Sequence, residues 1–104
     1  MRRAASDPIA DDAAALTLTE LARALALAPD WVVERVQAGL IEAGGVSAHA
    51  SPAEWRFEAV VVRRVRSMWH TEHCYDAAPE LAALVADLED EIDALRRRVA
   101  RLPR

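Results

Sequence analysis

Residues 79 to 102 read PELAALVADLEDEIDALRRRVARL, and their apolar residues follow a heptad repeat without interruption. Valine or isoleucine occupies position a of the repeat and leucine occupies position d. These predicted dimerisation residues are Leu81, Val85, Leu88, Ile92, Leu95, Val99 and Leu102. So narrow an apolar stripe is buried only against another helix, and β-branched residues at a with Leu at d favour a two-stranded coil. The sequence therefore predicts a long C-terminal helix that forms a homodimer with its own copy. Because three heptads are a short coiled coil, a helix packed on its own globular domain is the alternative.

The charges of this helix are segregated along its length. The first half carries the acids Asp87, Glu89, Asp90, Glu91 and Asp93, and the second half carries Arg96, Arg97, Arg98, Arg101 and Arg104. Two antiparallel copies set each acidic half against a basic half, whereas a parallel pair places like charges together. In a parallel pair, Glu91 at position g still reaches Arg96 at position e of the other copy. The helix macrodipole favours the same segregation in a single helix. Antiparallel pairing is favoured, and a parallel dimer stays open.

Length and composition restrict the class of protein. The chain has 104 residues, a formal net charge of −4 and one cysteine, and all 13 of its basic residues are arginine. This length allows one small domain plus the C-terminal helix, and a second copy would add buried area that so small a core lacks. An acidic chain binds polyanions poorly unless its basic residues cluster on one face. A single cysteine excludes an intrachain disulfide, and without a signal peptide or a bilayer-spanning apolar run we expect a cytoplasmic protein with no membrane partner.

The pattern divides the whole chain into three predicted segments. Residues 1–15 lack an apolar period, so we expect a disordered N-terminal arm. Residues 16–75 contain the predicted globular domain, and residues 76–104 contain the dimerisation helix. Asp76 is the expected N-cap of that last helix, with Pro79 in its first turn.

The globular domain begins with two short predicted helices. Thr19 is the expected N-cap of a helix that ends at Leu25, residues 26–28 form a tight turn, and Pro29 starts a second helix that Gly39 stops. Two short helices with this spacing are typical of a helix-turn-helix.

A small β element and a third helix complete the predicted domain. Residues 42–51 are rich in Gly, Ala and Ser and predict a loop or wing, while Trp55 and Phe57 alternate with Arg56 as in a strand that faces the core. A third helix is expected over residues 58–72. The fold class is therefore all-α with a minor β wing.

The order of these parts resembles the MerR family of winged helix-turn-helix proteins and, within it, the family of CbpM chaperone modulators. The resemblance covers residues 16 to 102. It rests on Leu18-Thr19-Glu20-Leu21, Gly39-Leu40-Ile41-Glu42, Trp55-Arg56-Phe57 and Arg63-Arg64-Val65-Arg66. It implies a MerR-like winged helix-turn-helix followed by a dimerisation helix. It also implies a protein that binds the J-domain of a CbpA/DnaJ-like co-chaperone and inhibits its action with Hsp70 (DnaK).

The resemblance directs attention to acidic residues, because a J-domain docks on Hsp70 through a basic helix and an inhibitor should present carboxylates with some apolar contact. The candidate J-domain-binding residues are Glu20, Asp30, Trp31, Glu34 and Glu42. The alternatives are that the acids form an ordinary solvated face and that Trp31 belongs to the core. The cluster of Arg63, Arg64 and Arg66 is likewise expected to be solvated.

No enzymatic chemistry is predicted, because no catalytic constellation is present, and no cofactor is implied. His70, His73 and Cys74 are the only residues that invite a metal site. Three ligands at a helix end make a poor zinc site, so no metal is expected.

The alternative function is a MerR-family DNA-binding transcriptional regulator. DNA-binding relatives carry an Arg-Tyr-Tyr-like run in the recognition helix, where this chain has Val33-Glu34-Arg35. From residue 16 to 58 three arginines stand against six carboxylates, and such a segment is repelled by phosphates, so DNA is an unlikely partner. In the turn, Ala26 stands where the family usually has Gly. A third possibility is an accessory subunit that assembles with another protein through the C-terminal helix.

Overall fold

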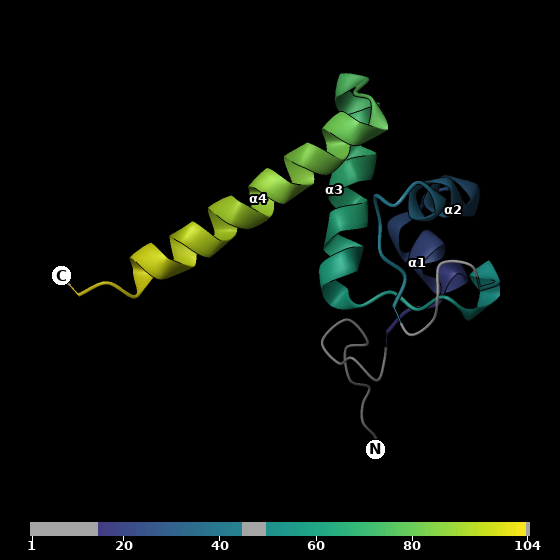
Figure 1. Ribbon diagram of the computed structural model, residues 1–104, viewed down its shortest axis with the longest axis horizontal. Coiled ribbons are helices and arrows are strands. Elements are labelled where there is room, and N and C mark those ends of the chain that lie inside the picture. Colours follow the sequence, from purple (N-terminus) through teal and green to yellow (C-terminus); the bar gives the residue numbers. More distant parts are fainter. Residues whose placement is uncertain (1–14, 45–49, 104) are drawn as a thin grey trace, which may run out of the picture. The chain divides into compact units, whose positions relative to one another are not determined.

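The computed structural model describes residues 15–44 and 50–103. The predicted disordered arm lies almost entirely outside these residues. The described chain is mostly helical, with α1 (Leu18–Leu25), α2 (Pro29–Gln37), the 3₁₀ turn η3 (Pro52–Glu54), α3 (Ala59–Tyr75) and α4 (Pro79–Ala100) (Figure 1). This confirms the all-α class. The chain divides into two compact units, Met1–Arg66 and Ser67–Arg104, and α3 runs across the division.

The N-cap of helix α1 lies two residues before the predicted one. Thr17, not Thr19, is the N-cap: its hydroxyl accepts from the Glu20 N–H at 3.1 Å, and the Glu20 carboxylate accepts from the Thr17 N–H at 2.9 Å. This reciprocal pair is a capping box, which needs Glu three residues after Thr. The prediction of Thr19 was wrong because Glu20 completes a capping box only with Thr17.

The turn between α1 and α2 keeps a geometry that usually requires glycine. Ala26 has φ 56° and ψ 47°, in the left-handed region, and the Leu27 N–H closes the end of α1 on the Ala22 carbonyl at 3.0 Å. Leu27 is buried beside the two helices, and Pro29 is the first residue of α2. Gly39, with φ 80°, follows the end of α2, as predicted.

We expect Ala26→Gly to stabilise the chain by about 0.5–1 kcal/mol, because glycine adopts the left-handed conformation without the steric cost that alanine carries. Ala24→Gly is the matched control: Ala24 is exposed inside α1, where glycine costs about 1 kcal/mol. Urea unfolding followed by circular dichroism measures both. Equal destabilisation by the two substitutions would contradict the strain assigned to Ala26.

The core of the first unit forms around Trp55 and Phe57, which are fully buried while the intervening Arg56 is exposed, as the alternation predicts. Leu21 of α1, Val32 of α2 and Val62 of α3 are also buried completely or nearly so. The expected β wing is reduced, within the described residues, to isolated bridges between Leu16 and Phe57 and between Gly44 and Arg56. The strand prediction was therefore right that Trp55 and Phe57 face the core, but it overstated the β pairing, which is limited to these bridges.

In the second unit, α3 continues three residues beyond its predicted end, to Tyr75, and α4 begins at Pro79, two residues later than a cap at Asp76 would give. Asp76 is not the N-cap of α4. That position is Ala78, with no side-chain hydrogen bond, while Asp76 has φ 53° and follows the end of α3. Aspartate tolerates this left-handed conformation better than most residues, so it terminates one helix and does not start the next.

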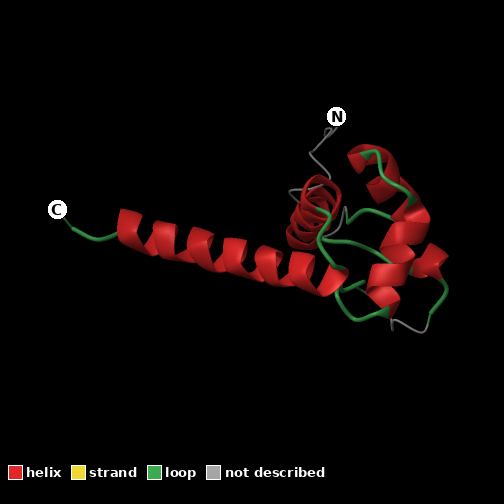
Figure 2. Cartoon of the chain, turned by 90° about the horizontal axis from the view of Figure 1, so that it is seen from above, coloured by secondary structure: helices red, strands yellow, loops and turns green. Residues whose placement is uncertain are grey.

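Helix α4 is a single straight helix (Figure 2) that buries small residues and exposes large ones. Ala82, Ala83 and Ala86 are its buried side chains. The Ser67 hydroxyl of α3 donates to the Glu89 carboxylate of α4, which ties the two helices of this unit together. The predicted heptad stripe lies on the face of α4 that the alanines leave outside.

Candidate functional site

The predicted acidic residues lie on the first unit, at the surface. Asp30 is in the first turn of α2 and Glu34 follows one turn later, so the two carboxylates lie on the same face of that helix. Glu42 is exposed in the segment after α2. Glu20 is exposed too, but its carboxylate is held by the capping box. Asp30 and Glu34 are therefore the pair that the local geometry brings together.

The structure places Trp31 in the core, with 9% of its surface exposed. The guanidinium carbon of Arg35 lies 4.8 Å from the centroid of the Trp31 ring, at the distance of a cation–π contact. Trp31 therefore offers little apolar surface to a partner and serves chiefly to support α2. Its role as a binding anchor stays a prediction.

Arg35 is folded back onto its own helix. Its side chain is only 13% exposed, and Nη1 lies 3.1 Å from Oε1 of Glu34, whose side chain is 71% exposed. The arginine head is thus occupied by Trp31 and Glu34, while the acid keeps most of its surface in water. This arrangement leaves the outer face of α2 negative at its centre.

Among the arginines of α3, Arg64 departs from the predicted solvated cluster. Its Nε donates to the Leu40 carbonyl at 2.9 Å, which fixes the segment after α2 to α3, while Arg63 and Arg66 are exposed. Sequence reasoning missed this role. The available signal was spacing: Arg64 is three residues after Val61 and four before Met68, so it lies at the edge of the apolar stripe of α3.

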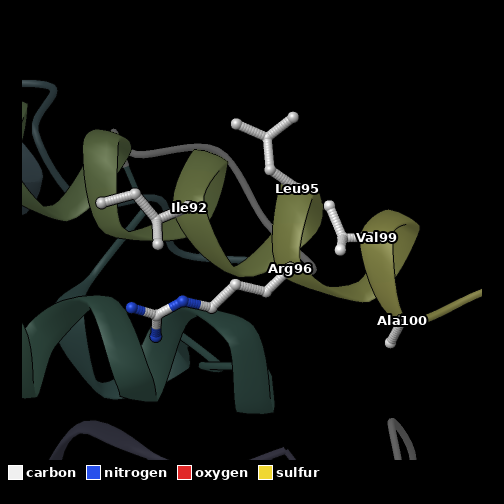
Figure 3. A pocket seen from close by; sticks show the side chains of 5 residues that line it. All are labelled: Ile92, Leu95, Arg96, Val99 and Ala100. Atoms are coloured by element: carbon white, nitrogen blue, oxygen red, sulfur yellow. The ribbon is translucent and has the colours of Figure 1, made fainter.

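The heptad stripe of α4 forms a continuous apolar surface on the second unit. Leu88 is 53% exposed, Ile92 46% and Leu95 51%, and Val85 is half-buried. Figure 3 shows Ile92, Leu95 and Val99 along the helix, with the Arg96 side chain extending back toward the turn that carries Ile92. These residues and Ala100 line a shallow groove of about 360 Å³. Leu102 lies beyond the end of α4 and is 65% exposed.

A second hollow, here called the corner groove, lies where α3 turns into α4 and measures about 610 Å³. It is lined by His70, Thr71, Tyr75, Asp76, Ala77, Ala78, Leu81, Val85 and Glu89. Its α4 side is formed by two members of the heptad stripe, Leu81 and Val85. The corner groove is therefore continuous with the stripe.

The histidines and the cysteine of α3 form separate pairs. Cys74 Sγ lies 3.4 Å from His70 Nδ1, whereas His73 stacks on Trp69 with ring centroids 3.7 Å apart and its Nδ1 lies 2.8 Å from the Trp69 carbonyl. Within residues 15–44 and 50–103, no three His, Cys, Asp or Glu side chains are grouped as a metal would need.

The helices of the described segments also lack any apolar stretch long enough to cross a bilayer. Searches against family models, curated proteins and solved structures find no match to this chain.

Proposed function

We propose that this chain is a non-enzymatic, cytoplasmic chaperone modulator of the CbpM type, which binds the J-domain of a CbpA/DnaJ-like co-chaperone and inhibits its action with Hsp70 (DnaK). One observation carries the proposal: α2 exposes Asp30 and Glu34 while its arginine, Arg35, is withdrawn onto Trp31. Such a face attracts a basic helix and repels a polyanion.

The mechanism is competition for a surface. The resemblance to CbpM chaperone modulators implies that the J-domain helix used by Hsp70 is basic, so carboxylates on α2 occupy the charges that Hsp70 needs. Glu42, exposed after α2, is a further carboxylate of the first unit that is open to a partner. Stoichiometric masking of this kind requires neither a catalytic residue nor a cofactor.

The C-terminal helix sets how many J-domains one modulator can bind. The exposed stripe of α4 pairs with the stripe of a second copy, since a large apolar surface of this kind marks an interaction site. A dimer presents two acidic faces, and each is available to one J-domain. The short turn between α1 and α2 and the paired segment at Phe57 support a MerR-like winged helix-turn-helix as the scaffold of that face.

A DNA-binding regulator of the MerR type is the second candidate. The α1–turn–α2 arrangement favours it, because a helix pair of this length is the element that enters the major groove in such regulators. It requires Arg35 to reach a base, and Arg35 is engaged with Glu34 and Trp31.

Glu34→Arg is expected to weaken binding of the purified J-domain by about tenfold, equivalent to about 1.4 kcal/mol, because it places a cation where the basic helix docks. Affinity of the parent chain is expected to fall with rising salt, since exposed charges are screened. Isothermal titration at two ionic strengths measures both effects.

Asp93→Arg is the matched control, because it reverses an exposed acid on α4 at a position outside the heptad stripe. It should leave J-domain affinity within about twofold of the parent. Retention of a DNA fragment by Glu34→Arg, together with J-domain affinity that is unchanged by the substitution and flat with salt, would favour the regulator instead.

A further inference from the structure

The first half of α3 carries a small cationic surface, here called the α3 face, which consists of Val60, Arg63 and Arg66. These residues are spaced three apart, so they follow one another along one side of the helix. All three side chains are exposed, and Val60 is 51% exposed. The α3 face belongs to the first unit, Met1–Arg66.

The two arginines of the α3 face are open to an anion. In the part of the chain that the structure describes, no ion pair joins either of them to an acid. By contrast, Arg35 is paired with Glu34, and Arg64 donates to the Leu40 carbonyl. Two neighbouring guanidinium groups in this state attract carboxylates or phosphates.

The chain that precedes Leu16 is attached beside this face. Leu16 and Phe57 form an antiparallel bridge, with N···O distances of 3.0 and 2.8 Å. In an antiparallel pair, the residue before one member lies beside the residue after the other. Ala15 is therefore on the side of Glu58, next to Ala59, where α3 begins. The residues before Ala15 are thus tethered at the start of α3.

The sequence of the tethered segment is complementary to the α3 face. Residues 11–15 read DDAAA, so two aspartates precede three alanines. At about 3.4 Å per extended residue, Asp12 and Asp11 lie within about 14 and 17 Å of the bridge. Counted from the bridge in the other direction, with about 1.5 Å per residue inside the helix, Arg63 and Arg66 lie at about 13 and 17 Å. The acids and the arginines are therefore reached at matching distances.

We infer that residues 11–14 bind the α3 face of their own copy and shield it from other anions. Asp12 pairs with Arg63, and Asp11 pairs with Arg66. The alanines that follow the two acids lie over Val60. The tether raises the local concentration of the acids, which compensates for the weakness of exposed ion pairs. The inference needs neither the J-domain nor a homodimer, so its failure would leave the proposed function unaffected.

A nitroxide spin label on Ala10→Cys, in a Cys74→Ser background, tests the contact in the full chain. Reversal of both arginines, Arg63→Glu with Arg66→Glu, should raise the amide signals of residues 61–66 at least about twofold at low salt, because the arm is then repelled. Addition of Asp11→Arg with Asp12→Arg should lower them again. Arg23→Glu, at an exposed arginine of α1, is the control and should leave the signals unchanged. Signals that do not respond to reversal of the two arginines would overturn the inference.

A mixed sample identifies the copy that supplies the acids. Spin-labelled chain without ¹⁵N is combined with ¹⁵N-labelled chain that carries no spin label. The signals of residues 61–66 should keep their intensity in this mixture, because the segment binds its own copy. Their loss would assign the α3 face to the segment of another copy and would overturn the inference.

Binding of a heparin oligosaccharide tests the shielding. Asp11→Asn with Asp12→Asn should bind this polyanion at least about threefold more tightly than the parent at low salt, because the arginines are exposed. Asp90→Asn with Asp93→Asn removes the same charge from α4 and should change the affinity less than about twofold. Addition of Arg63→Gln with Arg66→Gln to the first pair should cancel the gain. Equal gains for the two pairs of asparagine substitutions would overturn the shielding.

Discussion

Replacing Ile92 by aspartate is expected to convert the proposed dimer to monomers. Ile92 lies at the centre of the heptad stripe and is 46% exposed in the single chain, so the fold of one copy does not depend on it. Burying such a side chain contributes about 1.5–3 kcal/mol, and a symmetric dimer loses that contribution twice. Aspartate adds the cost of a carboxylate in an apolar interface. The dissociation constant should rise at least about 100-fold.

Sedimentation equilibrium of the parent and variant chains measures this change. Val60→Asp introduces the same charge at a side chain that is 51% exposed in the first unit, and it should leave the oligomeric state unaltered. Helical content should be the same in the parent and in both variants, because neither Ile92 nor Val60 is buried. A dimer that survives Ile92→Asp would mean that the exposed stripe is not the surface through which copies associate.

Phe57→Ala is expected to lower the free energy of unfolding of the chain by about 3–5 kcal/mol, as is usual for loss of a buried aromatic ring. Phe57 is fully buried and meets Trp55 edge-to-face, with ring centroids 6.4 Å apart and an interplanar angle of 89°. Its backbone also exchanges two hydrogen bonds with Leu16, so the ring stands where the start of the domain and the segment before α3 meet. The free energy of unfolding of a small domain is only about 5–15 kcal/mol in total, so this loss is a large part of it.

Urea unfolding by circular dichroism measures the loss, with Arg56→Ala as control. The Arg56 side chain is exposed and donates to the Trp55 carbonyl at 2.8 Å, so its removal should cost about 1 kcal/mol. Equal losses for the two variants would contradict the assignment of Phe57 to the centre of the core.

Local features of the chain were predictable because their signals lie within a few residues. Pro29 starts α2 and Pro79 lies in the first turn of α4, since the fixed φ of proline suits a first helical turn. The inward faces of Trp55 and Phe57 follow from alternation, and the long last helix follows from its heptad repeat. The cap of α1 was predictable from the same short range, because Thr17 has an acid three residues later, Glu20, whereas Thr19 has Ala22 there.

The candidate acidic face was only partly predictable for a different reason. The exposure of Asp30 and Glu34 follows from helical spacing and polarity. The burial of Trp31 beneath the guanidinium of Arg35 did not follow, because the same residues on a helix of the same period also fit an outward-facing tryptophan and a free arginine. Which face of α2 turns inward depends on the elements packed against it.

Helical period and proline were thus enough to predict the helices, their order and the apolar stripe of α4, because these signals act over one or two turns. Which charges remain available depends instead on tertiary contacts. Arg64 is tied to the Leu40 carbonyl and Arg35 to Trp31 and Glu34, while Glu34 stays 71% exposed. The tertiary structure also decided that α4 buries its alanines and leaves its leucines outside. The physical reason is that burial depends on contacts between segments far apart in the chain, which no local pattern specifies.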